Sequence, residues 1–196
     1  MQPWCHLKKM LIRHEREKLL NAIIFFAQNT SSLGKIKLWK LLYFLDFEHF
    51  KDTGRSVTGM QYKAWPKGPV PVELHNEIEN PNADMTAKVV FGKKNMRRTD
   101  RQMLTVTPVA AFDSSHFSKR ELRLMERLAG EFDKTYADDM IEATHLENQP
   151  WHKIYNEQGL KQQSIPFELA LRTQEEGELR HVVKERDEVL RNYTPQ

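Results

Sequence analysis

Two short stretches contain the residue types of zinc sites, but each lacks a ligand that the metal needs. Residues 14–18, HEREK, begin like the metalloprotease helix in which two histidines four positions apart bind zinc, but Lys18 stands at the place of the second histidine. Residues 145–147, HLE, have the His-x-Glu of zinc deaminases. That site also needs Pro-Cys-x-x-Cys, whereas Cys5 is the single cysteine of the chain. We therefore expect no metal site.

The spacing of the other candidate motifs argues against a phosphate-binding loop and a nucleophilic catalytic site. Gly54 and Gly59 are separated as in a phosphate loop, but Met60 occupies the position of the lysine that reaches the phosphates. No serine or cysteine stands in a recognisable pattern with a positioned base. We predict that the protein is not an enzyme, with no catalytic residues and no cofactor.

His145 and His152 lie on either side of a short turn that ends at Pro150. One interpretation is a shared ligand or proton-transfer site. The other is that His145 hydrogen-bonds backbone groups at the end of a helix, where a cation also suits the helix dipole. The residue pattern favours the second interpretation.

Both proline-flanked tryptophans could serve as interface anchors or as core residues. Residues 64–71, AWPKGPVP, hold three prolines and a glycine, which excludes a helix interior or a central strand. We interpret this stretch as a rigid corner that turns the chain from sheet to helix and fixes Trp65. Aromatic side chains are frequent binding anchors, but beside proline they more often pack in the core, and this is the interpretation we favour for Trp65 and Trp151.

These residues are carried by a chain that the apolar spacing predicts to be mainly helical. Residues 35–52 are apolar on nearly every side, which is typical of a helix at the centre of a fold, and Gly54 should end it. Ser118 and Glu121 predict a capping box, and Thr135 with Asp138 should open the next helix. Helices are expected over 15–28, 35–52, 71–79, 118–133, 135–145 and from Pro150, and strands over 60–65, 86–92 and 102–108. The fold class is thus α+β and predominantly α-helical, with a helical core and a small three-stranded antiparallel sheet.

The composition is that of a polar globular protein. The 196 residues carry a formal net charge of +3, and 39% of them are hydrophobic. The single cysteine fits a reducing compartment, and neither a secretory signal nor a membrane span is evident in the sequence. We expect a cytoplasmic protein with no membrane partner.

Nucleic-acid binding is the main alternative function from another class. Helix 35–52 carries Lys35, Lys37 and Lys40 and follows another helix, as a recognition helix does, but its apolar character argues for burial. The loop at 93–101 is basic and could contact phosphates, although such hairpin tips are more often simply solvated. DNA is therefore not the expected partner. The residues of this alternative are Lys93, Lys94, Arg97 and Arg98.

Several segments together resemble the Panacea domain, the family of SocA-like and phage-associated antitoxins. The resemblance covers about residues 16–170 and rests on Lys-Leu-Leu-Tyr, Trp-Pro-x-Gly-Pro-Val and Thr-His-x5-Trp in the order of the family. The matching segments are KLWKLLYFLDFEHF (37–50), GRSVTGMQYKAWPKGPVP (54–71), ELHNEIE (73–79), FSKREL (117–122) and ATHLENQPWHKIY (143–155).

The resemblance implies an antitoxin of a toxin–antitoxin system that binds a separately encoded toxin directly. One branch of the family instead acts as an adaptor that delivers its toxin to an ATP-dependent protease. No catalytic residues come with the family, and the sequence leaves the oligomeric state open. The residues we predict to bind the partner are Trp65, Lys67, Pro69, His145, Trp151 and His152.

The resemblance also sets the domain boundaries. Residues 1–15 form an N-terminal extension, too short for the DNA-binding domain that many members carry. Residues 16–170 are the antitoxin domain. Residues 171–196 are a charged C-terminal helix whose narrow apolar stripe makes it either a lid on the domain or a toxin-facing element, with the lid slightly favoured.

Overall fold

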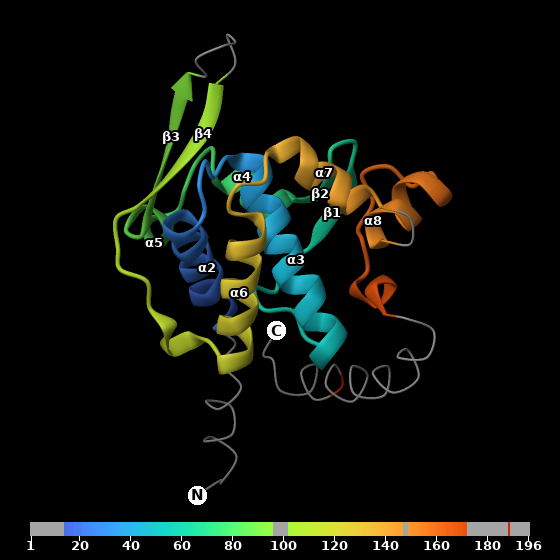
Figure 1. The fold of residues 1–196 in the computed structure, drawn as a ribbon, viewed down its shortest axis with the longest axis horizontal. Coiled ribbons are helices and arrows are strands. Elements are labelled where there is room, and N and C mark those ends of the chain that lie inside the picture. Colours follow the sequence, from blue (N-terminus) through green and yellow to red (C-terminus); the bar gives the residue numbers. More distant parts are fainter. Residues whose placement is uncertain (1–13, 96–101, 147–148, 172–187, 189–196) are drawn as a thin grey trace, which may run out of the picture.

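The fold is built around one apolar helix at its centre. The computed structural model describes residues 14–95, 102–146, 149–171 and 188. Helix α3 (Lys35–Thr53) runs through the middle of the molecule, with α2 (Glu15–Asn29) and α6 (Lys119–Phe132) on one side and the first hairpin and α8 on the other (Figure 1). Both predicted N-terminal helices are confirmed, and Gly54 ends α3 in the left-handed conformation (φ 65°).

The core lies where α3 meets its neighbours. Apolar residues that recur at helical spacing on α2 and α3 are buried together, as the sequence pattern predicts. Their burial supplies the main favourable free energy of folding. Fully buried members from these two helices include Ile23, Ile24, Phe26, Leu38, Leu41, Leu42 and Leu45.

Helix α6 is fixed at its start by the predicted capping box. The Ser118 hydroxyl accepts from the backbone N–H of Glu121, and the Glu121 carboxylate accepts from the Ser118 N–H. The same carboxylate pairs with Lys18 of α2 at 2.6 Å. A single buried glutamate thus caps one helix and ties it to another.

The C-terminal helices are shorter than predicted. Helix α7 (Ala137–His145) begins after Tyr136, and no side chain caps it, so the predicted cap between Thr135 and Asp138 is wrong. Pro150 is the first residue of α8 (Pro150–His152), as predicted. The chain then continues through the π-helical turn η3 (Lys153–Glu157) and the 3-10 turn η4 (Phe167–Ala170). The tail beyond 171 lies outside the described residues except for Glu188.

Two separate hairpins replace the single three-stranded sheet that the sequence predicted. Strand β1 (Tyr62–Trp65) pairs antiparallel with β2 (Gly68–Pro71), and β3 (Val89–Asn95) pairs antiparallel with β4 (Gln102–Pro108). The β3–β4 hairpin projects from the helical body (Figure 1). Short helical segments link these elements: α4 (Val72–Glu77), α5 (Ala83–Thr86) and η2 (Ser114–His116).

The proline-rich stretch is itself a strand, which corrects the predicted corner. Pro71 and Pro69 stand opposite Tyr62 and Ala64 of β1. In an antiparallel pair only alternate residues exchange hydrogen bonds, and Tyr62 and Ala64 instead bond residues 162–165 at 2.8 to 2.9 Å. The prolines therefore occupy positions at which a missing N–H costs nothing.

One buried carboxylate holds the connection between α3 and β1. Asp46 is fully buried and accepts four hydrogen bonds. The backbone N–H groups of Val57 and Thr58 donate to Oδ1 at 2.8 and 2.7 Å, and the hydroxyls of Thr58 and Tyr62 donate to Oδ2 at 2.5 and 2.7 Å. Burial raises the pKa of Asp46 to about 6, although these donors act in the opposite direction. Asp46 thus fixes the start of the first hairpin relative to α3.

Candidate functional site

The tip of the first hairpin is exposed, whereas its base is buried. Lys67 lies in the two-residue turn and faces solvent, while Gly68 and Pro69 are buried behind it. The half-buried indole of Trp65 packs edge-on against the His75 ring, with the ring centroids 5.4 Å apart. The hairpin therefore presents a short surface on a packed support.

The two proline-flanked tryptophans meet in the structure. The Trp151 indole N–H donates to the Trp65 carbonyl at 2.9 Å, across 86 positions of sequence. Trp151 is only 2% exposed, and its ring stacks on His145 at 3.7 Å and on Tyr155 at 4.6 Å between centroids. The preference for core packing holds for Trp151, which fastens α8 to the hairpin.

Among the described residues, His145 does not make the backbone hydrogen bonds predicted for it. Its ring stacks on Trp151, and its Nε2 is buried without a hydrogen-bond partner among the described residues. Burial lowers the pKa of His145, and the nearby Lys40 and His152 lower it further. His152 instead pairs with Glu157 at 3.1 Å. The two histidines are neighbours, but each side chain has a different partner.

A buried lysine, Lys40, lies beneath the hairpin. From the sequence alone it was only a possible DNA contact. Lys40 is 1% exposed, and among the described residues its ammonium donates to the Pro69 carbonyl alone, at 3.1 Å. Burial lowers the pKa of Lys40 to about 7. A reactive amine would need access to a substrate, and Gly68 and Pro69 cover this one. The helical position of Lys40 within an apolar stripe was the signal for its burial.

We expect Gly68→Ala to destabilise the protein. Gly68 has a φ of +94°, and a Cβ there would lie 2.3 Å from Lys40 Nζ and 2.7 Å from the Thr144 hydroxyl oxygen. Backbone strain and the collision together should cost about 2–3 kcal/mol in the free energy of unfolding, measured by urea denaturation.

Gly130→Ala is the matched control for this substitution. Gly130 lies within α6, and a Cβ there would meet nothing within 4 Å. Alanine should raise the free energy of unfolding by about 0.5–1 kcal/mol because glycine is a poor helix former. Equal effects of the two alanines would contradict the close packing of Gly68 over Lys40.

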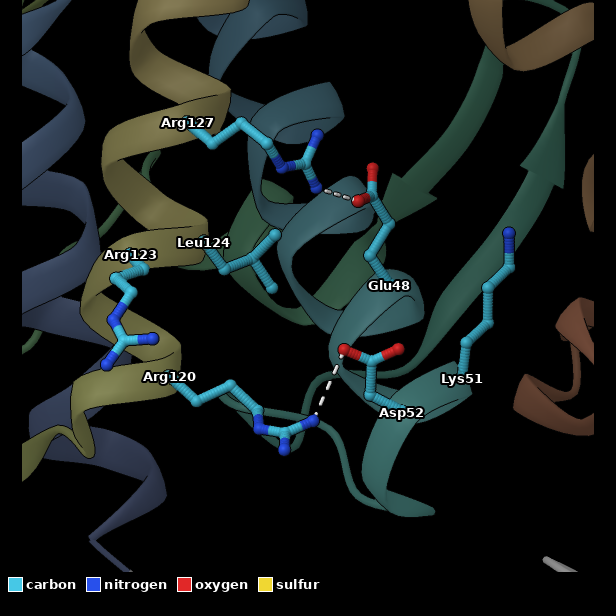
Figure 2. Close-up of a pocket in the computed structure, with 7 residues that line it drawn as sticks. All are labelled: Glu48, Lys51, Asp52, Arg120, Arg123, Leu124 and Arg127. Carbon is cyan, nitrogen blue, oxygen red and sulfur yellow. Dashed lines mark hydrogen bonds and ion pairs between the residues drawn. The ribbon is translucent and has the colours of Figure 1, made fainter.

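A charged groove lies between α3 and α6 (Figure 2). It has a volume of about 410 Å³. Arg120 of α6 reaches Asp52 of α3 at 3.4 Å, and Arg127 contacts Glu48. Arg123, between them on the same helix, has no ion-pair partner among the described residues. The three arginines are three and four positions apart, so the sequence alone could have placed them on one face of a helix. The groove is lined by Glu48, Lys51, Asp52, Arg120, Arg123, Leu124 and Arg127.

Two of the α3 lysines considered for nucleic-acid binding are buried in the structure. Lys37 and Lys40 of α3 are buried and donate to backbone carbonyls, so this helix cannot present them to a phosphate backbone. Lys93 and Lys94 are exposed at the end of β3. Arg97 and Arg98 lie outside the described residues.

Within the described part of the chain, no group of three or more His, Cys, Asp or Glu side chains is placed to hold a metal ion. In the same part, none of the helices has the length and apolar character needed to cross a membrane.

Comparison with known proteins gives one finding. The family model described as antitoxin SocA-like, Panacea domain, matches residues 38–152, which is more than half of the chain. Neither the curated proteins nor the solved structures include a significant match. The matched range runs from the first turn of α3 to α8, and so includes the first hairpin and both proline-flanked tryptophans.

Proposed function

Because the chain belongs to the family of SocA-like antitoxins with a Panacea domain, we propose that it neutralises a separately encoded toxin by binding it directly. The family gives the antitoxin role in general and implies a toxin partner. The proposal adds that neutralisation is stoichiometric and that the toxin docks at the tip of the β1–β2 hairpin. Such a role needs a stiff surface and no bond-making.

The observation that carries this proposal is the contrast between the exposed tip and its locked base. Lys67 is exposed at the tip, whereas Pro69 below it is held by Lys40. The Trp65 backbone is held from the other side by Trp151. A surface that is already ordered loses little entropy on binding, which favours affinity. We propose that Trp65, Lys67 and His152 contact the toxin.

Three further residues of the predicted site act as support in this proposal. Pro69, His145 and Trp151 lie behind the contact surface and do not need to touch the toxin. Pro69 and Trp151 are buried, and His145 is stacked on Trp151. Their substitution should weaken binding only through a loss of hairpin position.

Co-expression with the adjacent gene tests the proposed function. Expression of that gene alone should stop growth, and this chain should restore it through a complex that can be isolated at fixed stoichiometry. If the adjacent gene is harmless without this chain, the antitoxin proposal fails. If the chain restores growth only where an ATP-dependent protease is present and the toxin's lifetime shortens, the protein is an adaptor rather than a direct inhibitor.

Lys67→Glu should weaken toxin binding by about tenfold, because it reverses a charge at the proposed contact without touching the support. The dissociation constant of the purified pair, measured by calorimetry, is the readout. Lys119→Glu makes the same charge change at the exposed start of α6, away from the hairpin, and should leave the affinity unchanged. Equal affinities for the two variants would place the toxin away from the hairpin tip.

A further inference from the structure

The charged groove continues into an apolar hollow on the same helix. The hollow has a volume of about 210 Å³ and shares Glu48 and Lys51 with the charged groove. Phe44 of α3 stacks on Phe132 of α6 at one wall, with centroids 5.2 Å apart. Leu146, at another wall, is 59% exposed. We call the two together the α3–α6 groove.

We propose that residues 172–196 of this chain dock into the α3–α6 groove. The described chain reaches the groove just before this segment begins, since Ala170 lines the apolar hollow. Phe167 packs against Phe47 and Phe50 of α3, with centroids 4.5 and 5.3 Å away. The segment therefore begins beside the groove and can reach it without an additional linker.

The distances allow the segment to cover the whole groove. The lining residues of α3 run from Tyr43 to Asp52, which is a length of about 14 Å along a helix. Seven residues beyond Leu171 span up to about 24 Å when extended. A short piece of the segment is thus long enough to pass from the apolar end to the arginines.

The chemistry of the segment complements both parts of the groove. Leu179, Val183 and Leu190 recur at helical spacing, which is the pattern of a helix that binds in an apolar groove. The charged part of the groove has four basic side chains, Lys51, Arg120, Arg123 and Arg127, against two acidic ones, Glu48 and Asp52. The segment carries six acidic side chains against five basic ones, and three of the acidic ones, Glu175, Glu176 and Glu178, cluster near its start. The other acidic residues are Glu185, Asp187 and Glu188, and the basic ones are Arg172, Arg180, Lys184, Arg186 and Arg191.

Trypsin cleavage of the full-length chain tests the docking without any toxin. Trypsin sites within the segment include Arg180, Lys184 and Arg186. Where opening is fast, proteolysis follows the population of the open form. Cleavage at these sites should be at least about tenfold slower than in a synthetic peptide of residues 172–196, which corresponds to about 1.4 kcal/mol of docking free energy.

Charge reversal in the groove provides the second arm. Arg123→Glu replaces a cation that has no ion-pair partner among the described residues, and should accelerate cleavage within the segment about fivefold. Lys119→Glu on the same helix lies outside the groove and should leave the rate unchanged. Circular dichroism and the urea midpoint establish that both variants are folded.

Each outcome decides the proposal. Protection that does not depend on protein concentration and is weakened by Arg123→Glu supports it. A cleavage rate equal to that of the free peptide overturns it. Protection that grows with protein concentration assigns the groove to a second copy, and protection that appears only when the toxin is added assigns it to the toxin; either result also overturns the proposal. Because the first measurement uses the isolated chain, its failure leaves the antitoxin proposal intact.

Discussion

Asp46→Ala should lower the free energy of unfolding by about 3–5 kcal/mol, measured by urea denaturation. The substitution leaves two backbone N–H groups and two hydroxyls without their acceptor in the core. Tyr62 and Val57 are at most 1% exposed, so water cannot replace the lost partner without opening the structure. The segment that leads from α3 into the first hairpin should lose its fixed position, and toxin neutralisation should weaken with it.

Asp46→Asn is the matched variant that separates hydrogen bonding from charge. The amide oxygen can still accept from Val57 and Thr58, and the amide N–H₂ can donate to the two hydroxyl oxygens. The folded-state pKa of Asp46, about 6, lies above its ordinary value of 3.8. Ionisation therefore costs the folded state stability as the pH rises between these values, and asparagine has no such cost. We expect a loss of only about 1–2 kcal/mol; equal losses for alanine and asparagine would mean that the amide does not replace the hydrogen bonds of the carboxylate.

The sequence predicted those elements whose determinants are local. The left-handed residue at the end of α3 needs only Gly54, and the start of α6 needs only Ser118 and Glu121. The two strands of the second hairpin were also predicted, on either side of a short basic loop. In each case the residues that decide the structure are close together in sequence, so that reading the sequence was sufficient.

The first hairpin was missed because its determinants are distant. Proline is excluded from a strand only where its missing N–H would have to donate. The residues of β1 opposite Pro69 and Pro71 bond residues 162–165 instead, so neither proline has to donate. That pairing joins positions about a hundred residues apart, which no local pattern indicates. The same reason explains the wrong sheet. The second neighbour of β1, beside β2, is this short stretch rather than β3.

The candidate site likewise combines features with local sequence determinants and features with distant ones. The exposed tip at Lys67 follows from its place between proline and glycine. The contacts behind it, between Trp151 and Trp65 and between Lys40 and Pro69, join α8, α3 and the hairpin from distant parts of the chain. Asp46 and His49 of α3 are polar but buried, because neighbouring segments supply their hydrogen-bond partners.

We expect the stability of the wild-type protein to rise between pH 7 and pH 9, and Lys40→Met should abolish this rise. The pKa of Lys40 is lowered from its ordinary 10.5 to about 7 in the fold, so over this range the unfolded chain binds more protons than the folded one. Stability then increases with pH, by at most about 1.4 kcal/mol per unit, or about 2–3 kcal/mol over the two units.

The groups around Lys40 do not titrate in this range. The pKa of His145 is lowered from 6.5, so this ring is neutral throughout. Burial raises the pKa of Tyr43 and Tyr62 above 10, so both phenols stay protonated. The difference between wild type and Lys40→Met in the pH dependence of the free energy of unfolding, measured by urea denaturation at pH 7, 8 and 9, therefore reports on Lys40. Methionine fills a similar volume without a charge, so this position should contribute no pH dependence in the variant.

Lys37→Met on the same helix is the control, and it should behave in the opposite way at neutral pH. Both lysines are buried, but Lys37 donates to the Ser31 and Asp133 carbonyls at 2.9 and 2.8 Å, whereas Lys40 has the Pro69 carbonyl alone within the described part of the chain. Losing two partners should cost about 1–3 kcal/mol at pH 7. Lys40→Met should be at least as stable as the wild type there, because removing a buried charge with little compensation is often neutral or favourable. A large loss for Lys40→Met, or a slope that persists in it, would mean that the Lys40 ammonium stays charged and is stabilised in the fold. If Lys40→Met is stable yet no longer neutralises the toxin, the lysine serves binding at the expense of stability.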